Sequence, residues 1–198
     1  MRPALQARLA ALAHVAPEGA AISLALLVVG AIGLMVGFGL SGVAIVLFAL
    51  AVASFFRDPE RFADRTDGVV ISGADGKVTD VSEVALPGAS GARFNRISVF
   101  MSPLNVHVNR APVSGIVLKV EHTPGTFAAA FRDDASEHNE RNLIVFMDPA
   151  GRRHGMMQVA GYLARRIVCR LRVRDRIQLG QRVGLIMFGS RVDHFIPA

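Results

Sequence analysis

The feature that most constrains this chain is a long run without any charged side chain, from Gly19 to Phe56. Only three serines interrupt its apolar residues, and they lie far apart. A membrane-spanning helix needs about 20 residues, so this run is too long for one helix. It therefore predicts two short apolar helices that lie in a membrane.

Small residues mark the place where these helices separate. Gly37, Gly39, Ser41 and Gly42 lie near the centre of the run. They favour a turn, so we expect helices over 20–36 and 42–56 that form a hairpin. Each helix is at the short end of the spanning range, and the hairpin either spans the bilayer or dips into one leaflet. A buried hairpin in the core of a soluble protein is the alternative.

Arginines flank the run on both sides, and the positive-inside rule then places both flanks in the cytoplasm. We therefore predict a cytoplasmic segment 1–18, a membrane-anchoring hairpin 19–56 and a catalytic or binding domain 57–198. The expected location is the inner membrane of a cell, with the domain on the cytoplasmic side.

After the hairpin the sequence changes to short runs rich in Val, Ile and Phe, which Gly, Pro, Asp and Asn separate. The runs that predict strands are 68–72, 77–81, 96–101, 115–121, 142–147, 166–173 and 183–188. Many short strands at close spacing predict a mainly β domain of the sandwich or barrel type, with some helix. Residues 127–139 are expected to hold a helical turn or a loop.

The basic excess of the chain, a net charge of +6 at pH 7, is concentrated near the C-terminus. Arg170, Arg172, Arg174 and Arg176 alternate with Leu171 and Val173. Period-two alternation places the arginines on one face of a strand or an extended arm. This face is either simply solvated or contacts lipid phosphates, which guanidinium groups bind through paired hydrogen bonds. The chain has no tryptophan and no nucleic-acid recognition motif, so we expect no nucleic-acid partner.

The chain contains one cysteine, Cys169, which excludes an internal disulfide. No Cys/His spacing typical of zinc sites is present, so no metal site is predicted. We interpret Cys169 as a buried, inert thiol.

Three residues are candidates for chemistry, although each has a structural interpretation as well. Ser190 follows an apolar strand-like run and precedes a short polar tail, which we expect to stay free to move. Asp75 precedes Gly76 in a pair typical of hairpin turns. His107 lies in a strand-like segment between two prolines. Asp, His and Ser together can form a proton relay, but these common residue types do not by themselves establish one.

An ordered set of motifs resembles the phosphatidylserine decarboxylase family in its shorter form. The motifs are Phe55-Phe56-Arg57-Asp58-Pro59, Ala74-Asp75-Gly76-Lys77, the segment Met101–Pro112, Glu137-His138-Asn139-Glu140-Arg141-Asn142 and Phe188-Gly189-Ser190. The resemblance covers about residues 55–196, and the hydrophobic leader also fits it.

The sequence departs from the long bacterial members of this family at two places. Phe188-Gly189-Ser190-Arg191 stands where those members have Leu-Gly-Ser-Thr. They also carry two histidines three positions apart; here the first matches His107, and the second position is Arg110. Either His107 serves both self-cleavage and catalysis, or Arg110 takes over part of the work.

The resemblance implies a proenzyme that cleaves itself between Gly189 and Ser190. Ser190 would attack the carbonyl of Gly189, with His107 as the base and Asp75 orienting the imidazole. The products would be a β chain, 1–189, and an α chain, 190–198, that stay together as a heterodimer and allow a higher homo-oligomer. Ser190 would become a covalent pyruvoyl group, so no free cofactor is needed.

In the reaction that this resemblance implies, the ketone of Ser190 would form a Schiff base with phosphatidylserine in the membrane. Loss of carbon dioxide would then give phosphatidylethanolamine, in phospholipid biosynthesis. His107 is the leading proton donor; the other candidates are His122, His138, His154 and His194.

Two alternatives use the same residues differently. The chain could be a membrane-tethered, non-catalytic β-rich binding module in which Ser190 is a turn residue. It could also be a serine hydrolase that uses Ser190, His107 and Asp75 without self-cleavage. The G-x-S-x-G elbow of many hydrolases is absent, since Arg191 and Val192 follow the serine.

Overall fold

The computed structural model describes residues 15–63, 68–86, 93–128, 138–161, 166–187 and 190–198. They belong to two compact units, Met1–Glu60 and Arg61–Ala198. Most of the predicted N-terminal segment 1–18 and most of the predicted loop 127–139 lie outside the described residues.

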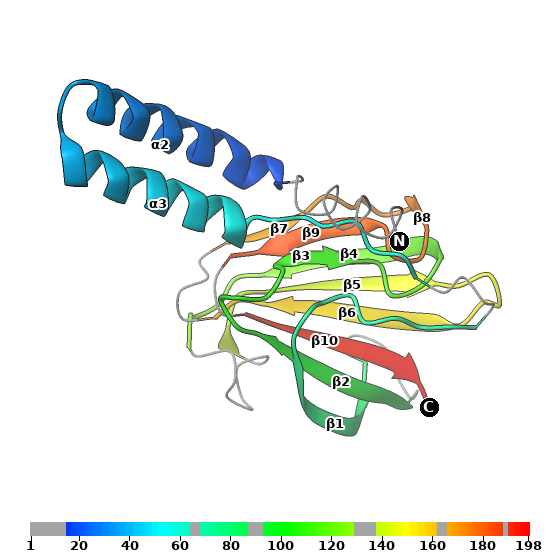
Figure 1. Cartoon of the computed structure of the whole chain (residues 1–198). Helices are drawn as coiled ribbons and strands as arrows, with labels where there is room; N and C mark the ends of the chain where they lie inside the picture. The colour runs from blue at the N-terminus through cyan, green and yellow to red at the C-terminus, as the bar shows by residue number, and fades with distance from the viewer. Residues whose placement is uncertain (1–14, 64–67, 87–92, 129–137, 162–165, 188–189) are drawn as a thin grey trace, which may run out of the picture. The chain divides into compact units, whose positions relative to one another are not determined.

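The first unit contains the predicted helical hairpin, formed by α2, Pro17–Met35, and α3, Gly39–Phe55 (Figure 1). Pro17 can begin α2 because proline has the φ of a helix and lacks only an N–H that would be unpaired there. Gly37 has a φ of +89°, in the left-handed region that glycine adopts freely, and it reverses the chain. The prediction of two apolar helices is confirmed, but Gly39 and Gly42 belong to α3 and not to the turn.

Small residues allow the two helices to approach closely. Gly19, Ser23 and Gly30 are the buried residues of α2. A Cβ atom added at Gly30 would lie 2.8 Å from Cγ2 of Val46 and 3.0 Å from its backbone nitrogen. Ser23 Oγ donates a hydrogen bond of 2.8 Å to the carbonyl of Gly19, so this buried hydroxyl is satisfied within its own helix. Small residues of this kind are typical of helix contacts in membranes.

The other faces of both helices expose large apolar side chains, such as Leu24, Leu40 and Phe48. By length and composition α2 could cross a membrane, whereas α3 is somewhat shorter. This is weak support for membrane association, because a signal sequence or a core helix of a soluble protein meets the same criterion.

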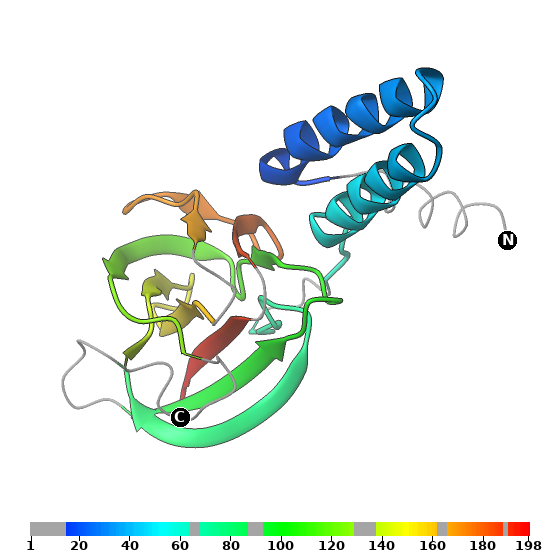
Figure 2. The same ribbon diagram turned by 90° about the vertical axis from the view of Figure 1, so that its left-hand side faces the viewer.

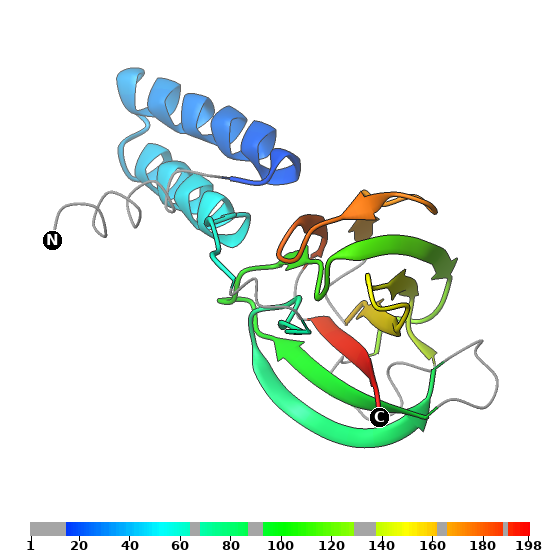
Figure 3. The ribbon, with the colours of Figure 1, turned by 90° about the vertical axis from the view of Figure 1, so that its right-hand side faces the viewer.

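The second unit is built from two antiparallel sheets, which confirms the prediction of a mainly β domain. The larger sheet has the strand order β1-β2-β10-β6-β5-β4-β8 and the smaller one β3-β9-β7. The strands are β1 Lys77–Ala85, β2 Arg93–Met101, β3 Val108–Arg110, β4 Gly115–Thr123, β5 Arg141–Met147, β6 Arg153–Val159, β7 Ile167–Cys169, β8 Arg176–Ile177, β9 Arg182–Ile186 and β10 Ser190–Pro197. Figures 2 and 3 show that the larger sheet is strongly curved, with β1 and β2 bowed around β10.

Both faces of the larger sheet are covered by apolar side chains, because successive residues of a strand point to opposite faces. In β5, Ile144 and Phe146 join one core with side chains from β9, while Leu143 and Val145 join a second core. A strand buried on both faces reads as a continuous apolar run and not as an alternation. This explains why the sequence of β5 has so few polar residues.

The position of the C-terminal segment corrects one prediction. The residues after Ser190 are not a mobile tail: they form β10, which pairs with β2 on one side and β6 on the other (Figure 1). Val192 and Phe195 enter the two cores, so apolar contacts on both faces hold the strand. The polar residues between them, which suggested a solvated tail, are buried as well.

Other predicted details were also wrong. Residues 68–72 form no strand; the backbone N–H of Ile71 donates to the carbonyl of Pro112 over 3.0 Å. Without that strand, Asp75 and Gly76 do not make a hairpin turn. The strand predicted over 166–173 ends at Cys169, whose thiol is only partly buried. Beyond it, Arg172 and Arg174 lie in a turn, where Arg174 has a φ of +77°, and Arg176 begins strand β8.

Candidate active site

Ser190 is the first residue of β10 and lies opposite Met101, the last residue of β2. The residue is fully buried, and its Oγ has no hydrogen-bond partner among the described residues. Gly189, the predicted cleavage partner, lies outside them. A buried hydroxyl without a partner costs about 1–3 kcal/mol, so stability alone does not explain the serine. Such unsatisfied groups are a feature of reactive sites.

His107 lies between β2 and β3 and is almost fully buried, as expected for a residue of a closed site. Its Nδ1 lies 3.0 Å from the carbonyl oxygen of Asn105. A carbonyl only accepts hydrogen bonds, so Nδ1 must carry the proton and a neutral imidazole presents its lone pair at Nε2. Asn105 is itself fixed, since its Oδ1 accepts from the backbone N and from Oγ of Ser102 over 2.9 and 2.7 Å.

Asp75 lies in a hollow of about 220 Å³ that Val106, Val108 and Arg110 also line. Val106 and Val108 are the chain neighbours of His107, so Asp75 faces the segment that carries the imidazole. The carboxylate of Asp75 forms an ion pair with Arg61. Among the described residues, no hydrogen bond joins Asp75 to His107 or to Ser190 Oγ.

The three candidates nevertheless meet at one place, the C-terminal end of β2. Ser190 pairs with Met101 there, and the chain continues from Met101 through a short turn to His107. The Asp75-Gly76 segment packs against the same end, because a Cβ atom at Gly76 would lie 2.2 Å from the carbonyl oxygen of Phe100. The structure therefore gathers residues that are far apart in the sequence.

On the face of the larger sheet that carries Ser190, hydrogen bonds link three buried amide side chains. This chain of amides was not predicted. Asn142 Nδ2 donates to Gln158 Oε1 over 3.0 Å, and Gln158 Nε2 donates to Asn109 Oδ1 over 2.9 Å. Asn109 Nδ2 then contacts Met101 Sδ, at 3.6 Å, beside Ser190. Asn109 and Asn142 belong to two of the ordered motifs, and Gln158 is a polar residue inside an apolar strand.

The opposite face of β10 carries a buried ion pair. Arg191 Nε lies 2.9 Å from Asp193 Oδ1, and Asp193 is fully buried. Burial raises the pKa of the Asp193 carboxyl, while the charge of Arg191 acts in the other direction. Alternation along the strand directs both side chains away from the face of Ser190.

His194 lies on the face of Ser190 but has the properties of a structural residue. Its Nε2 accepts a hydrogen bond of 3.2 Å from the backbone N–H of Gly73. Burial lowers the pKa of His194 to about 4, so the ring is neutral near pH 7 and is a poor proton donor there. His122 is exposed beside Glu140, and His138 is also exposed.

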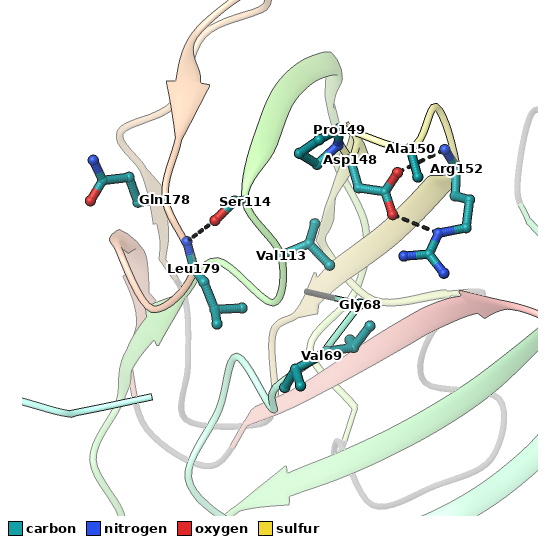
Figure 4. Close-up of a pocket in the computed structure, with 11 residues that line it drawn as sticks. Gly68, Val69, Val113, Ser114, Asp148, Pro149, Ala150, Arg152, Gln178 and Leu179 are labelled. Carbon is teal, nitrogen blue, oxygen red and sulfur yellow. Dashed lines mark hydrogen bonds and ion pairs between the residues drawn. The ribbon is translucent and has the colours of Figure 1, made fainter. Parts of the chain in front are cut away.

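A cavity of about 480 Å³ lies at the other end of the sheet, and Figure 4 shows residues that line it. Asp148 and Arg152 line it, next to the pairing of Met147 with Arg153, whereas Arg191 pairs with Val159 at the end of Ser190. Burial would raise the pKa of Asp148, but hydrogen bonds from Arg152 and His154 lower it to about 2. Arg152 and His154 therefore hold the Asp148 carboxylate in place, which is a structural role. No cluster among the described residues could hold a metal ion.

Comparisons with known proteins identify the family of this chain. The family model described as phosphatidylserine decarboxylase matches residues 48–198. A phosphatidylserine decarboxylase proenzyme of Anaplasma phagocytophilum is 49% identical over 168 residues, which cover 84% of this chain and 74% of the relative. A protein of the same name from Magnetococcus marinus is 46% identical over 167 residues, covering 82% and 77%. A third, from Azorhizobium caulinodans, is 44% identical over 178 residues, covering 88% and 76%. The family model covers most of the chain and these relatives are more than 40% identical to it, so this chain belongs to the phosphatidylserine decarboxylase family.

Proposed function

We propose that this chain decarboxylates phosphatidylserine to phosphatidylethanolamine with a pyruvoyl group made from its own Ser190. The observation that carries the proposal is the buried Oγ of Ser190, which has no hydrogen-bond partner among the described residues, at the start of a central strand. This position fits the group: converting the serine to a ketone breaks no side-chain hydrogen bond. The strand pairing would hold the new chain end in place.

Self-cleavage would begin when Ser190 Oγ attacks the carbonyl carbon of Gly189. His107 Nε2 would accept the hydroxyl proton, and the departing amide nitrogen of Ser190 would receive one as the C–N bond breaks. The two residues are then joined by an ester. Loss of the α-proton of residue 190 expels the carboxylate of Gly189 and leaves dehydroalanine. Water then replaces the nitrogen, which leaves as ammonia, and residue 190 ends as a ketone.

Asp75 would orient His107 and stabilise its cation during these steps. The pyruvoyl group supplies an electron-withdrawing ketone that accepts the electrons left when a carboxylate departs. His107 would return a proton to the carbon that lost carbon dioxide. Arg110 lines the same hollow as Asp75 and occupies the place of a second histidine in other members, so it is the second residue to examine.

After cleavage, residues 190–198 would remain with 1–189 as a heterodimer. The support is the position of β10, which has hydrogen-bonded partners on both sides and side chains in both cores.

The hairpin 19–56 would anchor the chain in the cell membrane, with the domain 57–198 on the cytoplasmic side. The exposed apolar faces of α2 and α3 support anchoring, and the flanking arginines support this orientation. A lipid substrate stays in the bilayer, so an anchored enzyme would meet it at the surface where it resides.

The proposal can be tested with the purified protein in vesicles that contain phosphatidylserine labelled in its carboxyl group. We expect release of labelled carbon dioxide, and we expect a carbonyl reagent such as phenylhydrazine to abolish it. Ser190→Ala should release none. Full activity after the carbonyl reagent would contradict the role of a ketone, and a binding module would release no label at all.

A further inference from the structure

A rigid turn at one edge of the larger sheet has no role in the reaction. It comprises Arg172-Val173-Arg174-Asp175-Arg176, and we call it the basic turn. Leu171 and Ile177 are buried on either side and fix its two ends. Its last residue, Arg176, begins β8, the edge strand of the sheet, which Figure 1 shows at the border of the domain.

Hydrogen bonds determine the shape of the basic turn. The backbone N–H of Arg172 donates to Asp175 Oδ2 over 2.7 Å, and that of Asp175 donates to the carbonyl of Arg172 over 3.1 Å. The N–H of Arg174 donates to the carbonyl of Val117 over 2.8 Å. Arg174 adopts a φ of +77°, which costs energy in a residue other than glycine. The turn is therefore held in one conformation by its surroundings.

This conformation presents positive charge and an apolar side chain together. Arg172, Arg174 and Arg176 are exposed, and the side chain of Val173 between them is 51% exposed. The one carboxylate of the turn, on Asp175, already accepts from the backbone. Among the described residues, no acidic side chain pairs with these three guanidinium groups.

We infer that the basic turn binds the anionic headgroups of a phospholipid bilayer, with its arginines on phosphates and Val173 entering the interface. Guanidinium groups bind phosphate oxygens through paired hydrogen bonds, and they are attracted to an anionic membrane surface. An apolar residue flanked by arginines is suited to the boundary between headgroups and acyl chains. Single-stranded nucleic acid is the less suitable partner, because the turn has no aromatic side chain on which a base could stack.

The strength of this lipid contact depends on the proposed anchoring of the chain in the membrane. A few arginines on a loop give weak binding from solution. A hairpin in the same bilayer makes the contact intramolecular and raises its effective concentration. The basic turn would then hold the domain in one orientation at the membrane, which the hairpin alone would not do.

The chain has no tryptophan, so Val173→Trp places a single fluorophore in the basic turn. The full-length variant is reconstituted in nanodiscs of phosphatidylcholine alone, or with one third phosphatidylglycerol, an anionic lipid that is not the substrate. We expect a blue-shifted emission, and quenching by brominated acyl chains, in the anionic nanodiscs. Both should decrease in 1 M salt and in neutral nanodiscs. Val81→Trp is the control, since Val81 is 66% exposed on β1, at the opposite edge of the sheet.

A second set of variants tests the arginines. Arg172→Gln with Arg174→Gln, added to Val173→Trp, should reduce quenching to the level of the neutral nanodiscs. Arg93→Gln with Arg153→Gln removes the same charge from other exposed sites and should leave quenching unchanged. Equal thermal stability of these proteins would show that folding is intact.

Three results would overturn the inference. These are equal emission in anionic and neutral nanodiscs, equal quenching of the Val81 control, and a response to single-stranded RNA but not to the anionic lipid. Carbon dioxide release from the same proteins, measured in nanodiscs that also contain carboxyl-labelled phosphatidylserine, separates this inference from the proposed function. Normal release without quenching overturns only the lipid contact, whereas quenching without release or chain cleavage overturns only the proposed function.

Discussion

Arg61 holds the carboxylate of Asp75 in an ion pair beside the segment that carries His107. Both side chains are substantially exposed, at 48% and 39%, and exposed ion pairs are worth only about 0–1 kcal/mol. The ion pair with Arg61 therefore holds Asp75 only weakly. In this structure the aspartate is close to its proposed place of action but is bound to another partner.

The different roles of Asp75 and Arg61 give a first prediction. Asp75→Asn keeps the size of the side chain but removes the charge that would stabilise the imidazolium, and should slow self-cleavage by about 10²–10⁴-fold. Arg61→Gln should change the rate by less than about tenfold, since it removes only an exposed ion pair. The rate is measured from the disappearance of full-length chain after synthesis in vitro. An equal effect of the two substitutions would contradict the role of Asp75.

His107→Gln removes the proposed base, and should slow self-cleavage by about 10²–10⁴-fold. His122→Gln is a suitable control, because His122 is exposed and pairs with Glu140. It should cleave at the normal rate in the same assay. Circular dichroism of both variants checks that the fold is intact. Normal cleavage of the His107 variant would exclude His107 as the base of self-cleavage.

The burial of His194 predicts a loss of stability at mildly acidic pH. Burial lowers the pKa of His194 to about 4, so the unfolded chain, with an ordinary pKa of about 6.5, binds the proton more readily than the folded chain. The contribution of neutral His194 to the stability of the folded protein is complete above the pKa of the unfolded chain. It is lost as the pH falls toward 4. Between pH 7.5 and 5, the loss should be about 2 kcal/mol.

Thermal and denaturant unfolding of an uncleaved Ser190→Ala protein can measure this loss. His194→Gln in the same background keeps an acceptor for the N–H of Gly73 and should lose about 2 kcal/mol less over that range. The comparison matters because Asp193, whose pKa burial raises, acts with the opposite sign: its folded state gains stability as the pH falls. If the free energy of unfolding changes with pH in the same way for both proteins, the pKa of His194 does not change on unfolding.

The helical hairpin offers a matched pair of glycine substitutions. Alanine favours a helix by about 1 kcal/mol over glycine, so Gly33→Ala should be neutral or stabilising, since its Cβ would lie 3.6 Å from the nearest atom. Gly30→Ala should destabilise the hairpin by about 1–3 kcal/mol, because its Cβ would meet Val46 at 2.8 Å. The helical signal in circular dichroism, followed on heating in detergent, measures both. A Gly30 variant at least as stable as the Gly33 variant would exclude this close contact.

The sequence allowed the general architecture to be predicted because its signals are local. An apolar run with central glycines predicts a hairpin, and short runs rich in Val and Ile predict strands. The role of β10 was missed because Arg191, Asp193 and His194 make it look like a solvated tail. Their burial depends on β2 and β6, which supply a partner strand on each side. Pairing between distant segments has no local signal.

The candidate site was also predicted only in part. Ser190, His107 and Asp75 came from the ordered motifs, and their meeting at the end of β2 is a property of the fold that spacing does not encode. Arg61 and Gln158 were missed, because an exposed arginine and a single glutamine are common in any sequence. Their significance comes from contacts with Asp75 and Asn109 across the fold.

The most direct test is the intact mass of the purified, membrane-reconstituted protein and of Ser190→Ala. We expect two chains from the native protein, residues 1–189 and a short chain 190–198 whose first residue has lost its amino group and carries a ketone. The alanine variant should give one uncut chain. A native protein that stays full-length and still decarboxylates phosphatidylserine would contradict the account.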